Sequence, residues 1–399
     1  MRKYFDYCNY TKLPRGTKTG PGHIQEGAIV MVVAHILYGL YVDEKMNITI
    51  GGVQTYIKCL SDVLLELDIK PIVYQYSKSA FKTVIDNCEI IGVKGAKSSS
   101  DILRFIDKMK PDYKNDILIF ATDFLICKSF FTKSLAIQHG IAWDGTQDKQ
   151  VGDVVNYFSI AKNALRSFVK YNRFKYCKHL VCVDYNFLNW YRTQVSHIDM
   201  ECYIIPNFAK KVPHRILNDN NYLSIVFARR LVQYRGTRLF AESIIPLMNK
   251  YKNLNVTIAG TGPDEAWLKE RFKMMDNITF TSYDAMNSIE FHKNFDIAVV
   301  PTKASEGTSL SLLEAMSAGC AVVATNVGGM TNIILDGYNG FLVNPKQNEL
   351  RDAIEYLILN VAERKIMAYR ARETVEISFS YKKWKKKWIN VIQNIQLKD

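Results

Sequence analysis

Short apolar runs alternate with amphipathic helical segments along most of the chain, and this alternation is what most limits the fold. In the first half it predicts strands at 28–34, 71–76, 116–121, 135–138 and 179–183, with a helix over 53–68. In the second half it predicts strands at 223–227, 256–259, 278–280, 297–301 and 321–325, with helices from about 239 and after 348. Strands that alternate with helices are typical of parallel sheets covered on both faces. The pattern therefore predicts an α/β protein.

The length of the chain predicts two domains. A chain of 399 residues, 48% of them apolar, is too long for one compact core and holds enough apolar side chains for two. The segment 207–221 is polar and basic and contains a proline, so we expect it to be a linker between an N-terminal domain at 1–206 and a C-terminal domain at 222–380. Two doubly wound, Rossmann-like domains that face a central cleft are the expected architecture.

The segment 301–345 bears most directly on function. Glu306 and Glu314 are separated by seven residues, and a helix is predicted from about 309 to 318, with Gly319 ending it. Glu306 then lies on the loop before the helix, and Glu314 lies within the helix. The backbone N–H groups at 308–310 point out of the helix N-terminus, where the dipole favours an anion. Two acceptors for hydroxyl groups beside these donors indicate a site for a phosphorylated sugar or a nucleotide.

The whole segment resembles the signature of the retaining nucleotide-sugar glycosyltransferases of family 4, which have the GT-B fold. The pieces that match in register are Glu306-Gly307, Glu314-Ala315-Met316, Gly319, 321–325, Gly328-Gly329, Asp336-Gly337, Asn339-Gly340 and Leu342-Val343. As an isolated pair, Glu306 and Glu314 would be interpreted as solvated surface charges. The number of matches in register argues against that interpretation. The resemblance also implies that the last helix, at 381–399, crosses back to the N-terminal domain, which is the acceptor side.

The resemblance implies roles for the residues of this segment. Glu306 would bind the hydroxyls of the donor sugar, and Glu314 those of the ribose. The sugar and the phosphates would be held by backbone amides of Gly307, Thr308, Ser309 and Leu310. The stretch 227–236 resembles a family motif whose two cations neutralise the diphosphate, and these would be Arg230 and Arg235. Two positions depart from the motif: Arg235 stands where lysine is usual, and Arg229 where glycine is usual.

Four other positions are expected to complete the site. Gly51 and Gly52 open the first helix and match a glycine pair that faces the donor. A lone glycine pair is otherwise just a turn. His139 ends a strand of the N-terminal domain and matches a histidine that touches the donor sugar, whereas an isolated histidine is usually structural. Gly262 matches a glycine after the second strand of the C-terminal domain, and Tyr283 is a stacking candidate for the nucleobase.

No metal ion or resident cofactor is expected. The chain has no Asp-x-Asp pair and no His, Asp or Glu cluster with metal-ligand spacing, so the arginines would have to neutralise the diphosphate. The eight cysteines form no C-x-x-C pair and are expected to be reduced and packed. Residues 1–27 contain no apolar signal segment, and no apolar run is long enough to span a membrane. These features predict a cytoplasmic protein.

The net charge of +13 is concentrated in two predicted basic helices, at 158–178 and 380–397. In the first, Lys162, Arg166, Lys170 and Arg173 share one face, and the opposite face is apolar. In the second, Trp384 and Trp388 lie on the apolar face. Such helices can lie on an anionic membrane surface. Alternatively, each apolar face packs against its own domain and the cations face solvent. The presence of two such helices favours a peripheral location on the inner face of the membrane.

The sequence thus predicts a metal-independent, retaining glycosyltransferase that moves a hexosyl unit from a nucleotide diphosphate sugar, expected to be a UDP-sugar, to a hydroxyl acceptor. A lipid-linked or cell-surface saccharide precursor would explain the basic helices. Two alternatives remain. In one, the acceptor is nucleic acid, which requires exposed aromatic side chains between the lysines and is disfavoured because Trp384 and Trp388 share an apolar face. In the other, the chain is a non-catalytic partner that keeps the fold.

Overall fold

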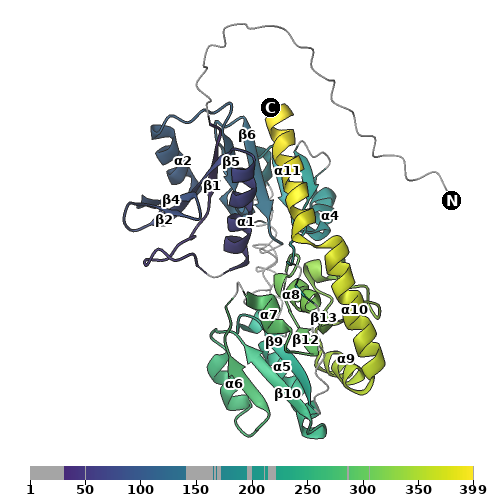
Figure 1. Cartoon of the computed structure of the whole chain (residues 1–399). Helices are drawn as coiled ribbons and strands as arrows, with labels where there is room; N and C mark the ends of the chain where they lie inside the picture. Colours follow the sequence, from purple (N-terminus) through teal and green to yellow (C-terminus); the bar gives the residue numbers. More distant parts are fainter. Residues whose placement is uncertain are drawn as a thin grey trace, which may run out of the picture. The chain divides into compact units, whose positions relative to one another are not determined.

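The computed structural model of the protein describes residues 31–49, 51–140, 165, 168, 172–195, 200–210, 212–213, 222–284, 287–304 and 306–398. The span Val32–Asp399 is one compact unit, and its described residues form two sheets (Figure 1). The basic segment 158–178 lies mostly outside the described residues. The apolar side chains of Leu165 and Phe168, which were expected to pack inward, are 64% and 52% exposed.

The first sheet has eight strands in the order β3-β4-β2-β1-β5-β6-β7-β8. Their bounds are β1 Val33–Leu37, β2 Lys70–Ser77, β3 Phe81–Ile85, β4 Cys88–Lys94, β5 Ile117–Phe120, β6 Lys133–Gln138, β7 His179–Cys182 and β8 Glu201–Ile204. All neighbours pair in parallel except β3, which is antiparallel to β4. Asp86 and Asn87 make the turn of that hairpin with φ of 49° and 62°, a conformation that Asp and Asn tolerate better than most residues.

The second sheet has six strands in the order β11-β10-β9-β12-β13-β14, all parallel. Their bounds are β9 Leu223–Ala228, β10 Leu254–Ala259, β11 Ile278–Thr281, β12 Ile297–Val300, β13 Ala321–Thr325 and β14 Phe341–Val343. In both sheets the first strand in sequence, β1 or β9, lies in the middle, and the strand order reverses beside it. Ligands of open α/β sheets bind at such a reversal, beyond the carboxyl ends of the strands.

Helices cover both faces of each sheet, which confirms the predicted doubly wound α/β fold. In the first sheet, α1 and α11 pack on one face and α2 and α4 on the other. In the second sheet, α5, α6 and α9 pack on one face and α8 on the other, where the end of α10 joins it. The helices are α1 Gly52–Glu66, α2 Ser99–Lys108, α4 Tyr185–Gln194, α5 Thr237–Lys250, α6 Glu265–Arg271, α7 Ser288–His292, α8 Leu310–Ala318, α9 Gln347–Leu359, α10 Val361–Ser378 and α11 Tyr381–Lys398.

Helix α11 packs on the first sheet although it follows the second sheet in sequence (Figure 1). Trp384 and Trp388 are 2% and 0% exposed, and the Trp388 indole N–H donates to the Tyr56 hydroxyl of α1 at 3.0 Å. Burial of an aromatic side chain of this size stabilises a fold by roughly 1.5–3 kcal/mol. For this helix, therefore, the apolar face packs within the protein and is not a membrane surface.

The predicted linker 207–221 lies between the last strand of the first sheet and the first strand of the second, and its first residues are packed. Phe208 lies against Tyr381 and Trp384 with ring centroids 4.9 and 4.7 Å apart. The backbone N–H of Ala209 donates to the Phe379 carbonyl at 3.0 Å. The backbone near residue 209, which leads into the second domain, therefore lies beside the backbone near residue 380, which leads back to the first.

Several predicted elements differ from those observed. The strand predicted at 28–34 is β1, which begins at Val33, and residues 28–30 lie outside the described part of the chain. This strand continues through His35, whose ring is buried because it bonds the Tyr74 hydroxyl at 3.0 Å and Asp116 Oδ2 at 3.3 Å. Strands β3, β4, β8 and β14 were not predicted. No helix among the described residues is long and apolar enough to cross a membrane. The seven described cysteines form no disulfide bond with one another, and five of them are buried, whereas Cys8 lies outside the described residues.

Candidate active site

Charged side chains from two central strands of the second sheet meet at the strand reversal. Arg229 directly follows β9, and the loop after β12 carries Thr302 and Glu306. The Arg229 Nη2 donates to both oxygens of Glu306, at 2.6 and 2.8 Å. The Thr302 hydroxyl donates to Glu306 Oε2 at 2.6 Å and accepts a bond from Arg229 Nη1. The Arg235 Nη1 lies 2.7 Å from Glu306 Oε1 as an ion pair without the alignment of a hydrogen bond.

This cluster is buried and holds Glu306 in its charged form. The side chains of Arg229 and Glu306 are 4% and 10% exposed, whereas that of Arg235 is 28% exposed. Burial by itself would raise the pKa of Glu306, but the charges of Arg229 and Arg235 outweigh it and lower that pKa to about 2. An ionised carboxylate has about four acceptor positions. In this structure Arg229 and Thr302 make three hydrogen bonds to the carboxylate, and Arg235 lies beside it as an ion pair.

A positive-φ glycine lets the arginine loop approach β12. Gly236, with φ of 86°, follows the short turn Gln233–Arg235 and precedes α5. A Cβ at this position would lie 1.8 Å from the Pro301 carbonyl oxygen, so a larger residue cannot fit there. Gly262 packs on the other side of the same loop, where a Cβ would lie 2.3 Å from the Leu231 oxygen. Gly262 therefore supports the arginine loop, and a direct donor contact remains a prediction.

The loop that leads from Glu306 into α8 touches the first domain. The Thr308 hydroxyl donates to the Val183 carbonyl, and the Asn207 side-chain amide donates to the Thr308 carbonyl at 2.6 Å. A Cβ on Gly307 would lie 2.5 Å from the His139 carbonyl oxygen. The close approach of the two backbones thus depends on a glycine at 307.

Helix α8 begins as predicted and ends as predicted. Ser309 is its N-cap residue and is buried, and its hydroxyl lies 3.3 Å from that of Ser311. Gly319 ends the helix with φ of 86°. Leu310, the first residue of the helix, lies against the N-terminus of α1, since a Cβ on Gly52 would be 3.1 Å from Leu310 Cδ1. Gly51 is the N-cap residue of α1. Two helix N-termini therefore meet here, which favours an anionic ligand.

His139 lies beside this contact as an uncharged side chain. Its Nε2 is 3.0 Å from the Ala121 carbonyl oxygen, and its ring meets Tyr56 edge-on at 5.1 Å. Burial lowers the pKa of His139 to about 4, so the imidazole is neutral at pH 7. Because Nε2 donates its hydrogen to the carbonyl, the neutral ring has only Nδ1 left as an acceptor, and it supplies no positive charge.

The Tyr283 hydroxyl lies 3.5 Å from the carbonyl oxygen of Ala228, which directly precedes Arg229, and Glu314 lies close to Tyr283. The Ser288 hydroxyl, at the start of α7, donates to Glu314 Oε2 at 2.6 Å. Burial raises the pKa of Glu314 to about 7, although the bond from Ser288 opposes the shift. Tyr283 stacks on Phe291 with centroids 4.6 Å apart, and burial, followed by the charge of Glu314, raises the pKa of Tyr283 to about 12. Residues 285–286, where the expected nucleobase loop ends, lie outside the described residues.

The sequence analysis missed Arg229 as a site residue. It assigned the cationic role to Arg230, whose side chain is exposed on the same loop, and treated Arg229 only as a departure from a motif. One signal was available. The β9 ladder continues through the Arg229 N–H, which donates to the Ala259 carbonyl at 2.9 Å. Side chains alternate along a strand, so the two arginines point to opposite faces of the sheet and only one of them can enter the buried cluster.

Among the described residues, no three His, Cys, Asp or Glu side chains come close enough to hold a metal ion. The described acids near the site, Glu306 and Glu314, have the arginines and Ser288 as partners.

Two doubly wound α/β domains, with charged residues at the strand reversal of the second, define the protein as one of the GT-B type. The model of the family "Glycosyl transferases group 1" matches residues 223–360. This segment, which carries Arg229, Arg235, Glu306 and Glu314, is therefore similar to the group 1 glycosyltransferases.

Known proteins resemble both the sequence and the fold. The uncharacterised glycosyltransferase MJ1069 of Methanocaldococcus jannaschii is 28% identical over 180 residues, which are 44% of this chain and 46% of that protein. The capsular polysaccharide biosynthesis glycosyltransferase CapM of Staphylococcus aureus is 26% identical over 172 residues, 42% of this chain and 44% of CapM. The chain thus spans less than half the length of these relatives. The structure of Anabaena HepE in complex with UDP-glucose superposes with a TM-score of 0.68 at 14% identity, over 91% of this chain and 99% of HepE, which shows the shared fold.

Proposed function

We propose that this protein is a retaining glycosyltransferase of family 4 that transfers a hexosyl unit from a UDP-sugar to a hydroxyl acceptor. The observation that carries the proposal is the buried cluster of Glu306, Arg229 and Arg235 next to the paired N-termini of α1 and α8. Cations and helix N-termini suit a diphosphate, and a charged carboxylate suits sugar hydroxyls. HepE was solved with UDP-glucose, and we propose the same class of donor here.

In this proposal Arg235 exchanges partners when the donor binds. Arg229 and Thr302 make three hydrogen bonds to Glu306, and Arg235 lies 2.7 Å from Oε1 beside the remaining acceptor position, so a sugar hydroxyl would reach Glu306 if Arg235 moved away. Arg235 is the most exposed of the three donors and the least well aligned. It would turn to the diphosphate with Arg230, while Arg229 and Thr302 keep the carboxylate in place. Both cations would then stabilise the charge that grows on the leaving phosphate, which itself accepts the acceptor proton.

The acceptor and the membrane remain proposals. CapM is named for capsular polysaccharide biosynthesis, and we propose that the acceptor here is also a glycan precursor, lipid-linked or at the cell surface. Since α11 buries its tryptophans, peripheral membrane contact would have to come from the 158–178 segment. In that segment the exposed side chains of Leu165, Phe168, Arg173 and Lys175 fit such a surface.

A panel of nucleotide sugars tests the proposed donor and the proposed lack of a metal. Thermal shift should identify one or a few UDP-sugars that stabilise the protein, and slow release of UDP should show turnover. Both should persist in excess EDTA, because arginines neutralise the diphosphate in this proposal. Loss of turnover in EDTA, restored by Mn²⁺, would show that the diphosphate is neutralised by a metal. If no nucleotide sugar binds, the non-catalytic alternative gains support.

Glu314→Ala should weaken binding of that UDP-sugar by about 1–3 kcal/mol, because the ribose hydroxyls lose a partly buried acceptor. In the wild type the affinity should also fall as the pH is lowered through about 7, because the pKa of Glu314 is raised to that value and the protonated carboxyl accepts less well. Calorimetry at a series of pH values measures both effects. Glu314→Gln is the matched control, since its affinity should not vary over this range. Equal affinities of wild type and Glu314→Ala would exclude the ribose role.

Helix α11 gives no support to the nucleic-acid alternative. It requires aromatic side chains that lie exposed between lysines, so that bases can stack on them. Trp384 and Trp388, between the lysines of α11, are buried in the first domain. In addition, Lys385 is paired with Glu66 at 2.5 Å, and Lys387 donates to the Ile204 carbonyl at 3.1 Å.

A further inference from the structure

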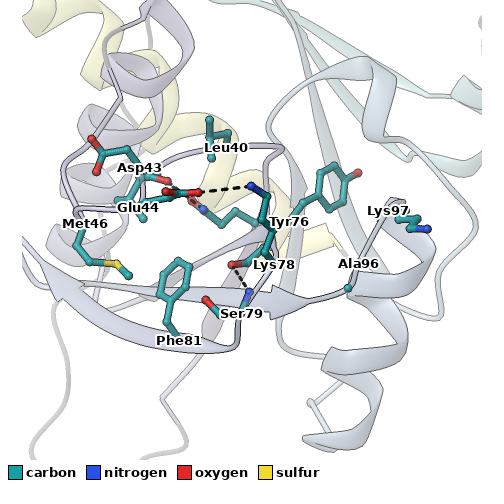
Figure 2. A pocket seen from close by; sticks show the side chains of 14 residues that line it. Leu40, Asp43, Glu44, Met46, Tyr76, Lys78, Ser79, Phe81, Ala96 and Lys97 are labelled. Carbon is teal, nitrogen blue, oxygen red and sulfur yellow. Dashed lines mark hydrogen bonds and ion pairs between the residues drawn. The ribbon is translucent and has the colours of Figure 1, made fainter.

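A hollow of 590 Å³ lies on the first domain, beyond the carboxyl ends of β2 and β4 (Figure 2). The loop between β1 and α1 forms one wall, and the segments that follow β2 and β4 form the others. Its lining is largely apolar with a charged rim. The residues that matter for its chemistry are Leu40, Glu44, Met46, Lys78, Phe81 and Lys97.

The wall from the β1–α1 loop is built rigidly by hydrogen bonds. The buried side chain of Gln75 on β2 accepts from the N–H groups of Tyr41 and Val42, both at 2.8 Å, and donates to the Val42 carbonyl at 3.0 Å. Within the loop, Asp43 Oδ1 accepts from the N–H groups of Lys45 and Asn47, both at 2.9 Å. The wall is therefore formed without a ligand, which reduces the entropy that binding would cost.

The floor carries an aromatic ring held flat against a strand. Phe81 on β3 pairs with Gly92 on β4. A Cβ on Gly92 would lie 2.1, 2.2 and 2.8 Å from three consecutive atoms of the Phe81 ring, so one face of the ring covers the glycine. The ring also lines the hollow, as Figure 2 shows. Its other face is thus available to a flat, weakly polar ligand.

The rim supplies both hydrogen-bond donors and acceptors. Glu44 Oε1 and Lys78 Nζ form an ion pair of 3.6 Å across the mouth, with side chains 91% and 96% exposed (Figure 2). Lys97 lies on the side formed by the segment after β4. A sugar ring has a C–H face that packs on an aromatic ring and a rim of hydroxyls that both donate and accept. Acids and lysines are balanced around the hollow, which favours a neutral ligand over a phosphate.

We propose that this hollow binds a neutral saccharide, with Phe81 as the stacking platform, and that this saccharide is the acceptor. The inference that it is the acceptor rests on the proposed transfer function. The hollow and the proposed donor site share one loop. Residues 40–49 wall the hollow and lead into Gly51 and Gly52, and Gln54 in the first turn of α1 bonds Thr49 Oγ1 at 2.8 Å. Gly52 in turn faces Leu310 of α8.

The test is binding of the full-length protein to an oligosaccharide array, followed by calorimetry with the neutral saccharide that binds best. Phe81→Leu keeps an apolar cover on Gly92 but removes the aromatic face. The double variant Glu44→Ala/Lys78→Ala removes only exposed rim groups, so it should fold normally. Each should weaken saccharide binding on the order of tenfold. Phe130→Ala, which alters a 76% exposed ring elsewhere in the same domain, is the matched control and should bind as the wild type does.

Three results would overturn the proposal: no neutral saccharide binds, binding is unchanged in both variants, or an octanoate probe displaces the saccharide and binds more tightly. UDP-sugar binding and UDP release, measured on the same samples, separate this proposal from the transfer function. Lost saccharide binding in the variants, with intact UDP-sugar binding and a lower saccharide-dependent release of UDP, supports the acceptor site. Saccharide binding without any donor turnover in the wild type leaves the saccharide site standing and excludes the transfer function.

Discussion

Glu306→Ala is expected to lower the free energy of unfolding of the second domain by about 3–5 kcal/mol, because it leaves a buried guanidinium without its carboxylate. The side chain of Arg229 is 4% exposed. In the variant it would keep the hydrogen bond to Thr302 but lose both bonds to Glu306. Urea denaturation, with hydrogen exchange of the β9 and β12 amides as the readout, measures the change in the second domain. A readout specific to this domain is needed because two domains need not unfold together.

Glu290→Ala is the matched control for this variant. Glu290 is 57% exposed at its side chain and pairs with Lys293 one helical turn away, so its loss should cost no more than about 0.5 kcal/mol. A Glu306→Ala protein as stable as this control would mean that the arginine cluster does not exist in solution as described.

The same cluster makes stability depend on pH. The pKa of Glu306 is lowered to about 2 from its ordinary value of 4.5. The carboxylate therefore contributes its full stability above the unfolded-state pKa and loses it as the pH falls from about 4.5 through about 2. A shift of this size corresponds to roughly 3 kcal/mol. The free energy of unfolding should therefore fall less between these pH values in Glu306→Gln than in the wild type.

Arg230→Ala is expected to lower kcat by about 10²-fold or more with the UDP-sugar identified by the panel, because the charge of the diphosphate grows in the transition state. Ground-state affinity should change much less. Arg230 tests this better than Arg235, because its side chain is exposed and its removal leaves the Glu306 pairs intact. Arg271→Ala, which removes a surface arginine paired with Glu242 at 3.0 Å, is the control. A near-normal kcat for Arg230→Ala would remove it from the diphosphate site.

Much of the framework of the site could be predicted from local sequence. Helix α8 and its end at Gly319 follow from apolar periodicity and a glycine stop. The strands β9, β10, β12 and β13 follow from apolar runs. Parallel strands then place Glu306 and the arginine loop at the same edge of the sheet.

Elements at the edges of the sheets were harder to predict. Strand β3 has an alternating burial pattern with partly exposed residues, and β14 has three partly buried residues. Short edge strands carry few apolar residues, so their signal is weak. Strand β1 extends beyond the predicted end at residue 34 and includes the polar side chain of His35. Its burial depends on Tyr74 and Asp116, which lie 39 and 81 residues away in the chain.

The sequence by itself determined the doubly wound α/β class, the positions of Glu306 and Glu314 on the loop after β12 and in α8, and the amphipathic face of α11, because each of these depends on residue order within one element. Only the tertiary structure decided which partners those residues take. It paired Glu306 with Arg229, 77 residues away, and buried Trp388 against Tyr56, 332 residues away. It also placed the ring of Phe81 over Gly92, where the ring lines the hollow. These contacts depend on how separate strands and helices pack, and packing geometry leaves no periodic trace in the sequence.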